Sequence, residues 1–477
     1  MIPKLTATET LNPVVQAYVT ALTAAGFAGD IEVSYASRLA VATDNSVYQQ
    51  LPAAVLLPKS AADVQLICSL AQTSSFSGIK FTPRGGGTGT NGQALTSAVV
   101  VDLSRHMREI LEINVEERWV RVQAGVIKDQ LNAFLKPYGF FFSPDLSTSN
   151  RATIGGMINT DASGQGSLVY GKTSDHVLAL DTVLMDGTVL HTHAMPTAQA
   201  EQIAERQDSI GRVYRQVLSS CRDFRADILN TFPRLNRFLT GYDLEHVFNE
   251  DLTQFDLSRV ITGSEGSLGF VTEAKLNITP IARYKCLVNV KYDSFESALR
   301  NAPFLVAAQA TSVETVDSKV LDLARNDIIW HQVRDFIQDV PGKTMLGLNM
   351  VEYNAEDEAD MAHKVQQLEE RLQQAVAKGE SGIIGYQLTY DNNAITQIYA
   401  MRKKAVGLLG NAKGSKKPIP FTEDTAVPPE NLADFIMEFR ALLDSHGLAY
   451  GMFGHVDAGV LHVRPALDMC DPEQEKQ

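Results

Sequence analysis

The fold is decided by one glycine-rich stretch, Phe81-Thr82-Pro83-Arg84-Gly85-Gly86-Gly87-Thr88-Gly89-Thr90-Asn91-Gly92. Five of the eight residues from Gly85 to Gly92 are glycines, so the backbone there carries few side chains. Such a backbone can adopt positive φ angles and can turn successive N–H groups toward one anion. The stretch therefore predicts a loop that binds a phosphate group.

Two common phosphate-binding motifs do not fit this stretch. A P-loop ends in Gly-Lys-Ser/Thr, and no such triplet follows here. The spacing Gly87-x-Gly89-x-x-Gly92 matches the Rossmann pattern, but that pattern requires a helix to begin at the third glycine. Gln93–Ser97 is too short for a helix, and Ala98–Leu103 reads as a buried strand. We therefore expect a loop that joins two strands and holds its phosphate without a helix dipole.

Length and charge limit the class of protein. A chain of 477 residues exceeds the usual size of one core, so we expect two or more domains. The net charge of −14 argues against a nucleic-acid partner, because phosphate contacts need clustered Lys and Arg side chains.

The four cysteines are scattered and contain no Cys-x-x-Cys pair, so the sequence predicts neither disulfides nor an iron–sulfur cluster in this chain. The N-terminus lacks a basic-then-apolar signal, and no run of eighteen apolar residues occurs. We expect a cytoplasmic protein without an integral membrane segment.

Two further glycine-rich tracts follow the first. One runs from Ser147 to Gly164 and contains Gly155-Gly156, and the other runs from Val260 to Glu273. Glycines together with Asn159 and Ser163 would let the backbone pack closely against a flat ligand. Taken alone, the Gly-Gly pair fits an ordinary turn between helices equally well.

The C-terminal half has a different pattern. Apolar runs and amphipathic segments between Cys286 and Thr389 follow the order β-α-β-β-α-β, which is typical of a ferredoxin-like unit. Together with the mixed first half, this order predicts an α+β protein. The domain bounds that we expect are a helical segment 1–46, a nucleotide-binding domain 47–282, a ferredoxin-like domain 283–465 and a short segment 466–477.

A late stretch, Gly454–His462, carries two histidines. Seven residues apart on one straight strand, His455 and His462 would point to opposite faces. A tight turn at Ala458-Gly459 would instead pair them across a hairpin, where both could bind one metal ion. Spacing alone leaves open that the two histidines are unrelated.

Taken together, the three tracts resemble the FAD-binding domain of the vanillyl-alcohol-oxidase-like flavoproteins. Within that group the chain resembles the D-2-hydroxyacid dehydrogenases, which include D-lactate dehydrogenases, glycolate oxidase subunits and D-2-hydroxyglutarate dehydrogenases. The resemblance covers residues 45 to 470, and within this range Gly241-Tyr242-Asp243 also matches the family. It implies a bound FAD and a ferredoxin-like cap domain that covers the substrate. The cofactor-binding residues that it implies are Arg84, Gly85, Gly86, Gly87, Thr88, Gly89, Thr90, Asn91, Thr148, Gly155, Gly156, Asn159, Ser163, Gly164, Tyr170, Gly263, Glu265 and Gly266.

The same resemblance implies the chemistry. A divalent metal such as zinc, bound by His455 and His462, would orient a 2-hydroxy acid, and Arg402 would bind the substrate carboxylate. A histidine or a metal-assisted base would take the hydroxyl proton while hydride passes to flavin N5. The expected catalytic residues are therefore His455, His462 and Arg402.

The chain departs from the family pattern at the metal site. Ala458 and Val460 stand where the family usually has Asp and Asn. The family's completing carboxylate lies in a later Glu-His-Gly segment, which is absent before Gln477, so the sequence predicts a truncated chain with an incomplete site. Glu423 is an acidic candidate nearby. The chain most resembles the long bacterial members of the family, which carry an iron–sulfur region after the flavin part; that region, the electron acceptor that the resemblance implies, is also absent here.

The sequence leaves two other functions open. One is an FAD oxidase of alcohols or sugars that reacts with oxygen, and the other is a non-catalytic flavin-fold subunit. The intact loop from Arg84 to Gly92 argues against the second. The particular 2-hydroxy acid is not predicted, although a dicarboxylate would need a second cation, such as Arg464 or a lysine.

Overall fold

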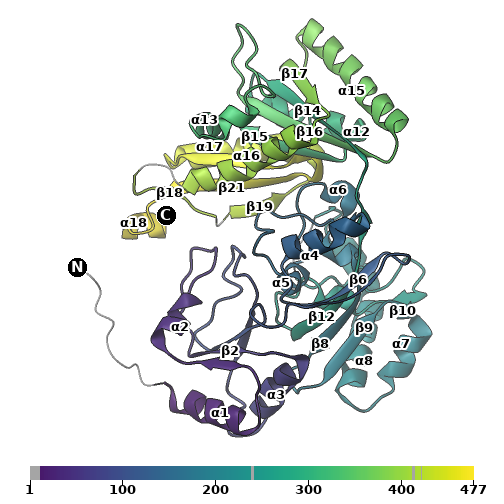
Figure 1. Cartoon of the computed structure of the whole chain (residues 1–477), viewed down its shortest axis with the longest axis vertical. Helices are drawn as coiled ribbons and strands as arrows, with labels where there is room; N and C mark the ends of the chain where they lie inside the picture. The colour runs from purple at the N-terminus through teal and green to yellow at the C-terminus, as the bar shows by residue number, and fades with distance from the viewer. Residues whose placement is uncertain (1–10, 238–240, 411–413, 421) are drawn as a thin grey trace. The chain divides into compact units, whose positions relative to one another are not determined.

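The computed structural model describes residues 11–237, 241–410, 414–420 and 422–477, without the side chains of residues 405–410, 423 and 424. The chain divides into two compact units (Figure 1). The first comprises Met1–Ala162, Lys172–Arg234 and Leu239–Pro280, and the second comprises Ser163–Gly171, Leu235–Phe238 and Ile281–Gln477.

The first unit contains both helices and strands. They are α1 (Pro13–Ala24), β1 (Asp30–Glu32), α2 (Tyr35–Ala40), β2 (Ala54–Leu57), α3 (Ala61–Ala71), β3 (Phe81–Arg84), β4 (Val99–Asp102), β5 (Ile110–Asn114), β6 (Trp119–Gln123), α4 (Lys128–Leu135), β7 (Phe140–Phe141), α5 (Ile154–Asn159), β8 (Val177–Val183), β9 (Val189–His193), β10 (Met195–Pro196), α7 (Thr197–Ala204), α8 (Ser209–Asp223), α9 (Arg225–Thr231), β11 (Gln254–Phe255), α10 (Ser258–Ile261), β12 (Phe270–Asn277) and β13 (Thr279–Pro280).

The first subdomain is a small sheet in the order β1-β2-β4-β3, in which β2, β4 and β3 are parallel. The continuous apolar runs of β2 and β4 suit parallel strands that are covered by helices. Tyr18 of α1 is fully buried in the core of this sheet, and its hydroxyl donates to the carbonyl of Ile67 in α3 at 2.8 Å. Residues 11–46 therefore pack into the first unit, although the sequence analysis had set residues 1–46 apart.

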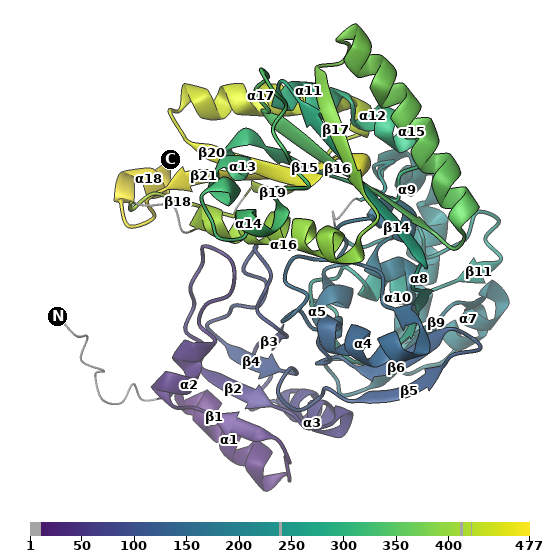
Figure 2. The same ribbon diagram turned by 45° about the horizontal axis from the view of Figure 1, so that its top comes forward.

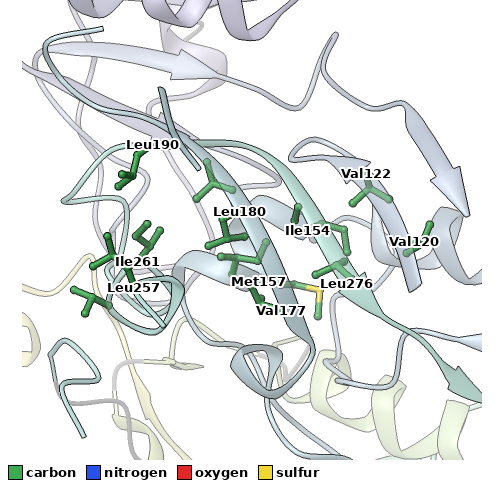
Figure 3. Packing of buried hydrophobic residues seen from close by; sticks show 14 of the residues in the cluster. Val120, Val122, Ile154, Met157, Val177, Leu180, Leu190, Leu257, Ile261 and Leu276 are labelled. Atoms are coloured by element: carbon green, nitrogen blue, oxygen red, sulfur yellow. The ribbon is translucent and has the colours of Figure 1, made fainter. Parts of the chain in front are cut away.

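The second subdomain is an antiparallel sheet in the order β5-β6-β12-β8-β9. Val120 and Val122 of β6 alternate with more exposed residues and face the core. Figure 3 shows them beside Leu276 of β12, with Ile154 and Met157 of α5 in the same cluster. This packing fixes α5, which carries the second glycine tract, against the sheet.

The second unit contains one large sheet that is covered by helices. Its elements are α6 (Ser167–Tyr170), β14 (Tyr284–Tyr292), α11 (Phe295–Arg300), α12 (Ala302–Ala307), β15 (Ser312–Asp317), α13 (Ser318–Arg325), α14 (Trp330–Val333), β16 (Gly347–Ala355), α15 (Glu358–Lys378), β17 (Ile383–Thr389), α16 (Asn392–Gly410), β18 (Lys417–Pro418), β19 (Thr422–Ala426), α17 (Leu432–Ser445), β20 (Tyr450–His455), β21 (Val460–Leu467) and α18 (Pro472–Lys476).

The strands β17-β14-β16-β15 lie in this spatial order and are antiparallel, as in a ferredoxin-like unit. The sheet then continues through β20, β21 and β18, and β19 also pairs with β21. Helices cover both faces: α11, α12, α15 and α17 contribute to one apolar cluster, and α13, α14 and α16 to the other (Figure 2). The expected α+β class with a ferredoxin-like unit is confirmed, and the sequence analysis had not predicted the extension of the sheet.

The unit bounds differ from the expected domain bounds in one further respect. Ser163–Gly171 and Leu235–Phe238 come from the first half of the chain but belong to the second unit. The Nδ2 group of Asn354 donates to the hydroxyl of Tyr170 at 3.1 Å, which ties the first of these segments to β16. Residues 466–477 are also part of the second unit.

No helix in the described part of the chain combines the length and the apolar composition needed to cross a lipid bilayer.

Candidate functional site

The glycine loop lies between parallel strands β3 and β4 and contains no helix, as the sequence predicts. Gly87 and Gly92 have φ angles of 61° and 77°, values that favour glycine. Across residues 86–90, none of the five successive backbone N–H groups donates to an acceptor in the described part of the chain. Successive amides that have no acceptor within the described part of the chain suit an anionic ligand such as a diphosphate.

Arg84 fixes the start of this loop. Its guanidinium donates to the carbonyls of Val41 at 3.1 Å and Thr43 at 2.8 Å. Burial lowers the pKa of Arg84, and the charges of Asp102 and Asp44 oppose that shift. Arg84 thus contacts the chain's own backbone, and its expected contact with the cofactor stays a prediction.

The second tract packs directly against the first. A Cβ atom on Gly85 would collide with the side chain of Thr153, and one on Gly86 would collide with the carbonyl of Arg151. Thr153 also caps α5, because its Oγ1 accepts from the N–H of Gly156 at 3.2 Å. The turn before it is closed at Thr148, whose carbonyl accepts from the N–H of Arg151 at 2.8 Å. Glycine is therefore required at both loop positions for the two tracts to meet.

The third tract is joined to the second by Asn159. Its backbone carbonyl accepts from the N–H of Glu265 at 2.8 Å, and its Oδ1 accepts from the N–H of Gly266 at 3.1 Å. Gly263, Glu265 and Gly266 all have positive φ angles, between 55° and 82°. A Cβ on Gly266 would collide with Pro83 of β3, so the third tract also contacts the first. The three tracts converge within the first unit.

Three of the expected cofactor-binding residues do not belong to this group. Ser163, Gly164 and Tyr170 fall in the second unit. The carbonyl of Ser163 accepts from the guanidinium of Arg237 at 2.9 Å, and burial raises the pKa of Tyr170.

The expected histidine hairpin is present in the second unit. Strands β20 and β21 pair antiparallel, and a 3-10 turn at Val456–Ala458 ends at Gly459, which has a φ of 68°. The turn is therefore longer than the two residues that the sequence predicted. His462 lies opposite Phe453, two residues before His455, so both histidines share one face of the sheet. Their ring centroids are 5.4 Å apart.

A buried carboxylate connects His455 to Arg402. Glu314 of β15 has no exposed surface and lies opposite His455 in the sheet. One carboxylate oxygen is hydrogen-bonded to Nδ1 of His455, and the other forms an ion pair with the guanidinium of Arg402 in α16. His455 and Arg402 are each 5% exposed. A proton on Nδ1 that faces Glu314 leaves the lone pair of His455 on Nε2.

Sequence reasoning did not select Glu314. The available signal was one acidic residue in the middle of the short predicted strand Ser312–Val316, because a carboxylate rarely enters a core without a partner. Asp457, in the hairpin turn, is a second buried carboxyl group, and its burial and the nearby charge of Glu314 raise its pKa to about 7.

The two histidines offer two of the three protein ligands that a catalytic zinc ion normally takes. Among the described residues, no group of three or more His, Cys, Asp and Glu side chains is arranged to hold a metal ion. The side chain of Glu423, the acidic candidate, lies outside the described residues.

The glycine loop between two strands, the two glycine tracts packed against it and the ferredoxin-like unit are the elements of the vanillyl-alcohol-oxidase-like fold that the sequence analysis expected. The family model described as FAD binding domain matches residues 52–193, and the model described as FAD linked oxidases, C-terminal domain, matches residues 281–477. The two matches lie in the two halves of the chain and agree with the FAD-binding domain and cap domain that the resemblance of the glycine tracts had implied.

Two relatives with high sequence identity to this chain are D-2-hydroxyglutarate dehydrogenases. The chain is 63% identical over 475 residues to D-2-hydroxyglutarate dehydrogenase of Pantoea ananatis (strain AJ13355), an alignment that covers 100% of this chain and 46% of that protein. It is 62% identical over 475 residues to D-2-hydroxyglutarate dehydrogenase of Escherichia coli (strain K12), with 100% and 47% covered. The chain spans about half the length of these curated relatives.

A solved structure supports the fold independently. Alkyldihydroxyacetonephosphate synthase superposes with a TM-score of 0.67, covering 97% of this chain and 78% of that one. The sequence identity is 15%, so this likeness concerns the fold alone.

Proposed function

We propose that this chain is the flavin-binding part of a dehydrogenase that oxidises a D-2-hydroxy acid to the corresponding 2-oxo acid. The observation that carries the proposal is the buried Glu314 carboxylate, which holds an imidazole and a guanidinium on one side of a sheet. A guanidinium suits a substrate carboxylate, and an imidazole suits a hydroxyl proton. The relatives named D-2-hydroxyglutarate dehydrogenase support this reading and disfavour an alcohol or sugar oxidase.

We assign FAD binding to the first unit. The backbone amides of residues 86–90, which donate to no acceptor among the described residues, suit the diphosphate, and the tract held by Asn159 would support the remainder of the cofactor. When bound, FAD supplies the hydride acceptor for the oxidation. Ser163, Gly164 and Tyr170 remain candidates for the same cofactor from the second unit.

We assign substrate binding and proton transfer to the second unit. Arg402 would bind the carboxylate beside the hydroxyl group, because a guanidinium has five N–H donors and the ion pair with Glu314 leaves others available. His455 would accept the hydroxyl proton at Nε2, while Glu314 holds its Nδ1 proton. The substrate loses this proton and the hydrogen on Cα, with its electron pair, to become a 2-oxo acid.

A divalent metal is part of the proposal. His455 and His462 share one face and would supply two ligands; the Nε2 lone pair of His455 would then bind the metal in place of accepting the hydroxyl proton. A third ligand would come from outside the described side chains, with Glu423 as one candidate. A bound metal would lower the pKa of the substrate hydroxyl. We also propose that the electrons leave through an iron–sulfur region outside this chain.

The protein is proposed to work in the cytoplasm. All four cysteines are free thiols, and Cys68, Cys221 and Cys286 are buried. Unpaired buried thiols suit a reducing compartment.

A dye-reduction assay of the FAD-loaded chain tests the function. We expect reduction with D-2-hydroxyglutarate, slower reduction with D-lactate, and none with the L-isomers. His455→Ala and His462→Ala should each lower kcat at least about 100-fold, because general-base catalysis contributes about that much. His363→Ala, on the exposed face of α15, is the matched control and should change nothing. A flavin-loaded protein that no 2-hydroxy acid reduces would contradict the proposal.

A further inference from the structure

Residues 163–171 form a short crossing segment, which leaves the first unit after Ala162 and returns to it at Lys172. Three of its nine residues are glycines, and two of these, Gly166 and Gly171, have a φ of 76°. Glycine loses more conformational freedom on ordering than any other residue. A segment of this composition therefore needs contacts from outside itself to keep one conformation.

An ion pair joins the two ends of the crossing segment inside the first unit. The ammonium group of Lys172 lies 2.8 Å from a carboxylate oxygen of Asp161, and both residues are 6% exposed. Beside this pair, the N–H of Thr173 donates to the carbonyl of Ala162 at 3.1 Å, and the hydroxyl of Thr173 donates to the same carbonyl at 2.6 Å. These contacts close the segment at its base and so restrict the residues between its ends.

Asp161 is itself fixed by its surroundings. Its φ is 46°, in the left-handed region that Asp and Asn adopt more readily than most residues. Its Oδ1 accepts from the N–H of Ser174 at 2.8 Å, and its Oδ2 accepts from the hydroxyl of Ser174 at 3.1 Å. A Cβ on Gly263 of the third glycine tract would lie 3.5 Å from the Cβ of Asp161. Asp161 therefore lies beside a tract of the expected flavin site and holds one end of the crossing segment.

The middle of the crossing segment is held within the second unit. Gln165 donates to the carboxylate of Glu352 at 3.2 Å, and Asn354 donates to the hydroxyl of Tyr170 at 3.1 Å. Three residues of the segment are among the expected cofactor-binding residues: Ser163, Gly164 and Tyr170. The conformation of this segment thus determines where three candidate flavin contacts lie.

We infer that the Asp161–Lys172 ion pair is a clamp that holds the crossing segment in the conformation that binds flavin. Asp161 and Lys172 are positioning residues, because they act through the segment and are not among the expected cofactor contacts. The inference rests on the proposed assignment of FAD binding and does not depend on the substrate. Without the clamp, the segment would adopt the binding conformation for only part of the time, and the apparent Kd for FAD would rise in inverse proportion to that fraction.

Lys172→Met tests the clamp, because it removes the ammonium group and keeps an unbranched apolar stem. We expect the Kd for FAD, measured by fluorescence titration of the flavin-free chain, to rise about 10-fold, as when the binding conformation falls to a tenth of the population. In the flavin-free protein, the amides of residues 163–171 should exchange hydrogen faster than in the unsubstituted chain. An unchanged Kd, or unchanged exchange in this segment, would overturn the inference.

A second variant keeps the test possible if the first does not fold. Lys172→Met leaves the buried carboxylate of Asp161 without the charge of its partner, which is costly in a protein interior. Combining it with Asp161→Asn removes both charges, and Asn also adopts positive φ angles. We expect this double variant to fold and to show the same weaker FAD binding. FAD binding as tight as in the unsubstituted chain would count against the clamp.

Lys291→Met is the matched control. Lys291 of β14 is also buried, at 3% exposed, and its ammonium group donates to Gln387 at 2.7 Å and to the carbonyl of Gln338. Both acceptors lie outside the crossing segment and the glycine tracts. We expect this variant to lower the melting temperature of the flavin-free protein but to leave the Kd for FAD unchanged. An equal rise in Kd would show that the loss of any buried lysine weakens flavin binding, and would contradict the inference.

Dye reduction separates this inference from the proposed function. If FAD binding depends on the clamp but no 2-hydroxy acid reduces the bound flavin, the proposed function fails and the inference stands. If D-2-hydroxyglutarate reduces the bound flavin but Lys172→Met binds FAD as tightly as the unsubstituted chain, the inference fails and the function stands. A chain that binds no FAD would overturn both.

Discussion

Glu314 lies in a fully buried strand, and its carboxylate contacts an imidazole and a guanidinium at once. Removing a charge from water costs several kcal/mol, so such a residue needs partners of opposite charge or good hydrogen bonds. Both oxygens of Glu314 are used in this way. The residue therefore orients two proposed substrate-binding groups with one side chain.

The substitution Glu314→Gln keeps the shape of this side chain and removes its charge. We expect kcat for dye reduction to fall about 10- to 100-fold, as when an outer partner of a ligating histidine is lost. The buried Arg402 would lose its counter-charge, which we expect to lower the free energy of unfolding by about 3 kcal/mol or more. Kinetics, metal content and thermal unfolding measure these effects.

The control for this substitution is Glu296→Gln, which removes an exposed carboxylate paired with Arg300 on α11. Exposed pairs contribute at most about 1 kcal/mol, so little should change. Unchanged kcat and thermal stability in Glu314→Gln would show that the charge of Glu314 is not needed to orient His455 and Arg402.

Asp317, at the end of β15, gives a prediction about pH. It accepts from the N–H groups of Val320 at 2.9 Å and Met452 at 3.2 Å, but burial dominates and raises its pKa to about 6. The folded state binds the proton of Asp317 more tightly than the unfolded state does. Protonation therefore stabilises the folded state, and this stabilisation is complete below about pH 4 and is lost as pH rises through 6. A pKa shift of this size corresponds to about 3 kcal/mol in the free energy of unfolding.

Asp317→Asn resembles the protonated carboxyl group at every pH. We expect its melting temperature to change less than that of the unsubstituted protein between pH 4 and pH 7, and the difference to favour the variant increasingly as pH rises. Thermal scans across that range measure it. Parallel curves for the two proteins would contradict the assignment.

At the scale of elements, local patterns in the sequence determined what could be predicted. The glycine loop between two strands, the β-α-β-β-α-β order and the histidine hairpin each follow from a short stretch of residues. Contacts between distant segments were not predictable in this way. The pairing of Glu314 with residues 402 and 455, and the contact of Gly266 with Pro83, depend on strand order and tertiary packing.

The convergence of the three tracts leads to a prediction about Gly86. A Cβ at this position would collide with the carbonyl of Arg151, so Gly86→Ala should push the loop away from the second tract. We expect the flavin-to-protein absorbance ratio of purified protein to fall several-fold. Gly78→Ala is the control, because a Cβ there meets nothing within 4 Å and its φ is ordinary. Equal flavin content in both variants would mean that this close contact does not shape the cofactor site.

At the scale of the whole molecule, the chain passes between its two units more than once. It enters the second unit at Ser163–Gly171 and again at Leu235–Phe238, before the long segment that begins at Ile281. The second unit is thus completed by residues from the first half of the chain. Gln165 donates to Glu352 at 3.2 Å, and Arg237 is buried within this unit.

Because the chain enters the second unit several times, we can predict how the protein behaves after cleavage at one site. Ile281 is 37% exposed, and a protease site introduced beside it would separate the two halves of the chain covalently. We expect the fragments to elute together in size-exclusion chromatography, because residues 163–171 of the first fragment remain packed in the second unit. Replacing both Gln165 and Tyr170 by Ala removes the hydrogen bonds to Glu352 and Asn354 and should weaken the association, whereas the exposed Leu168→Ala should not. Fragments that separate without denaturant would show that these segments add little to the stability of the second unit.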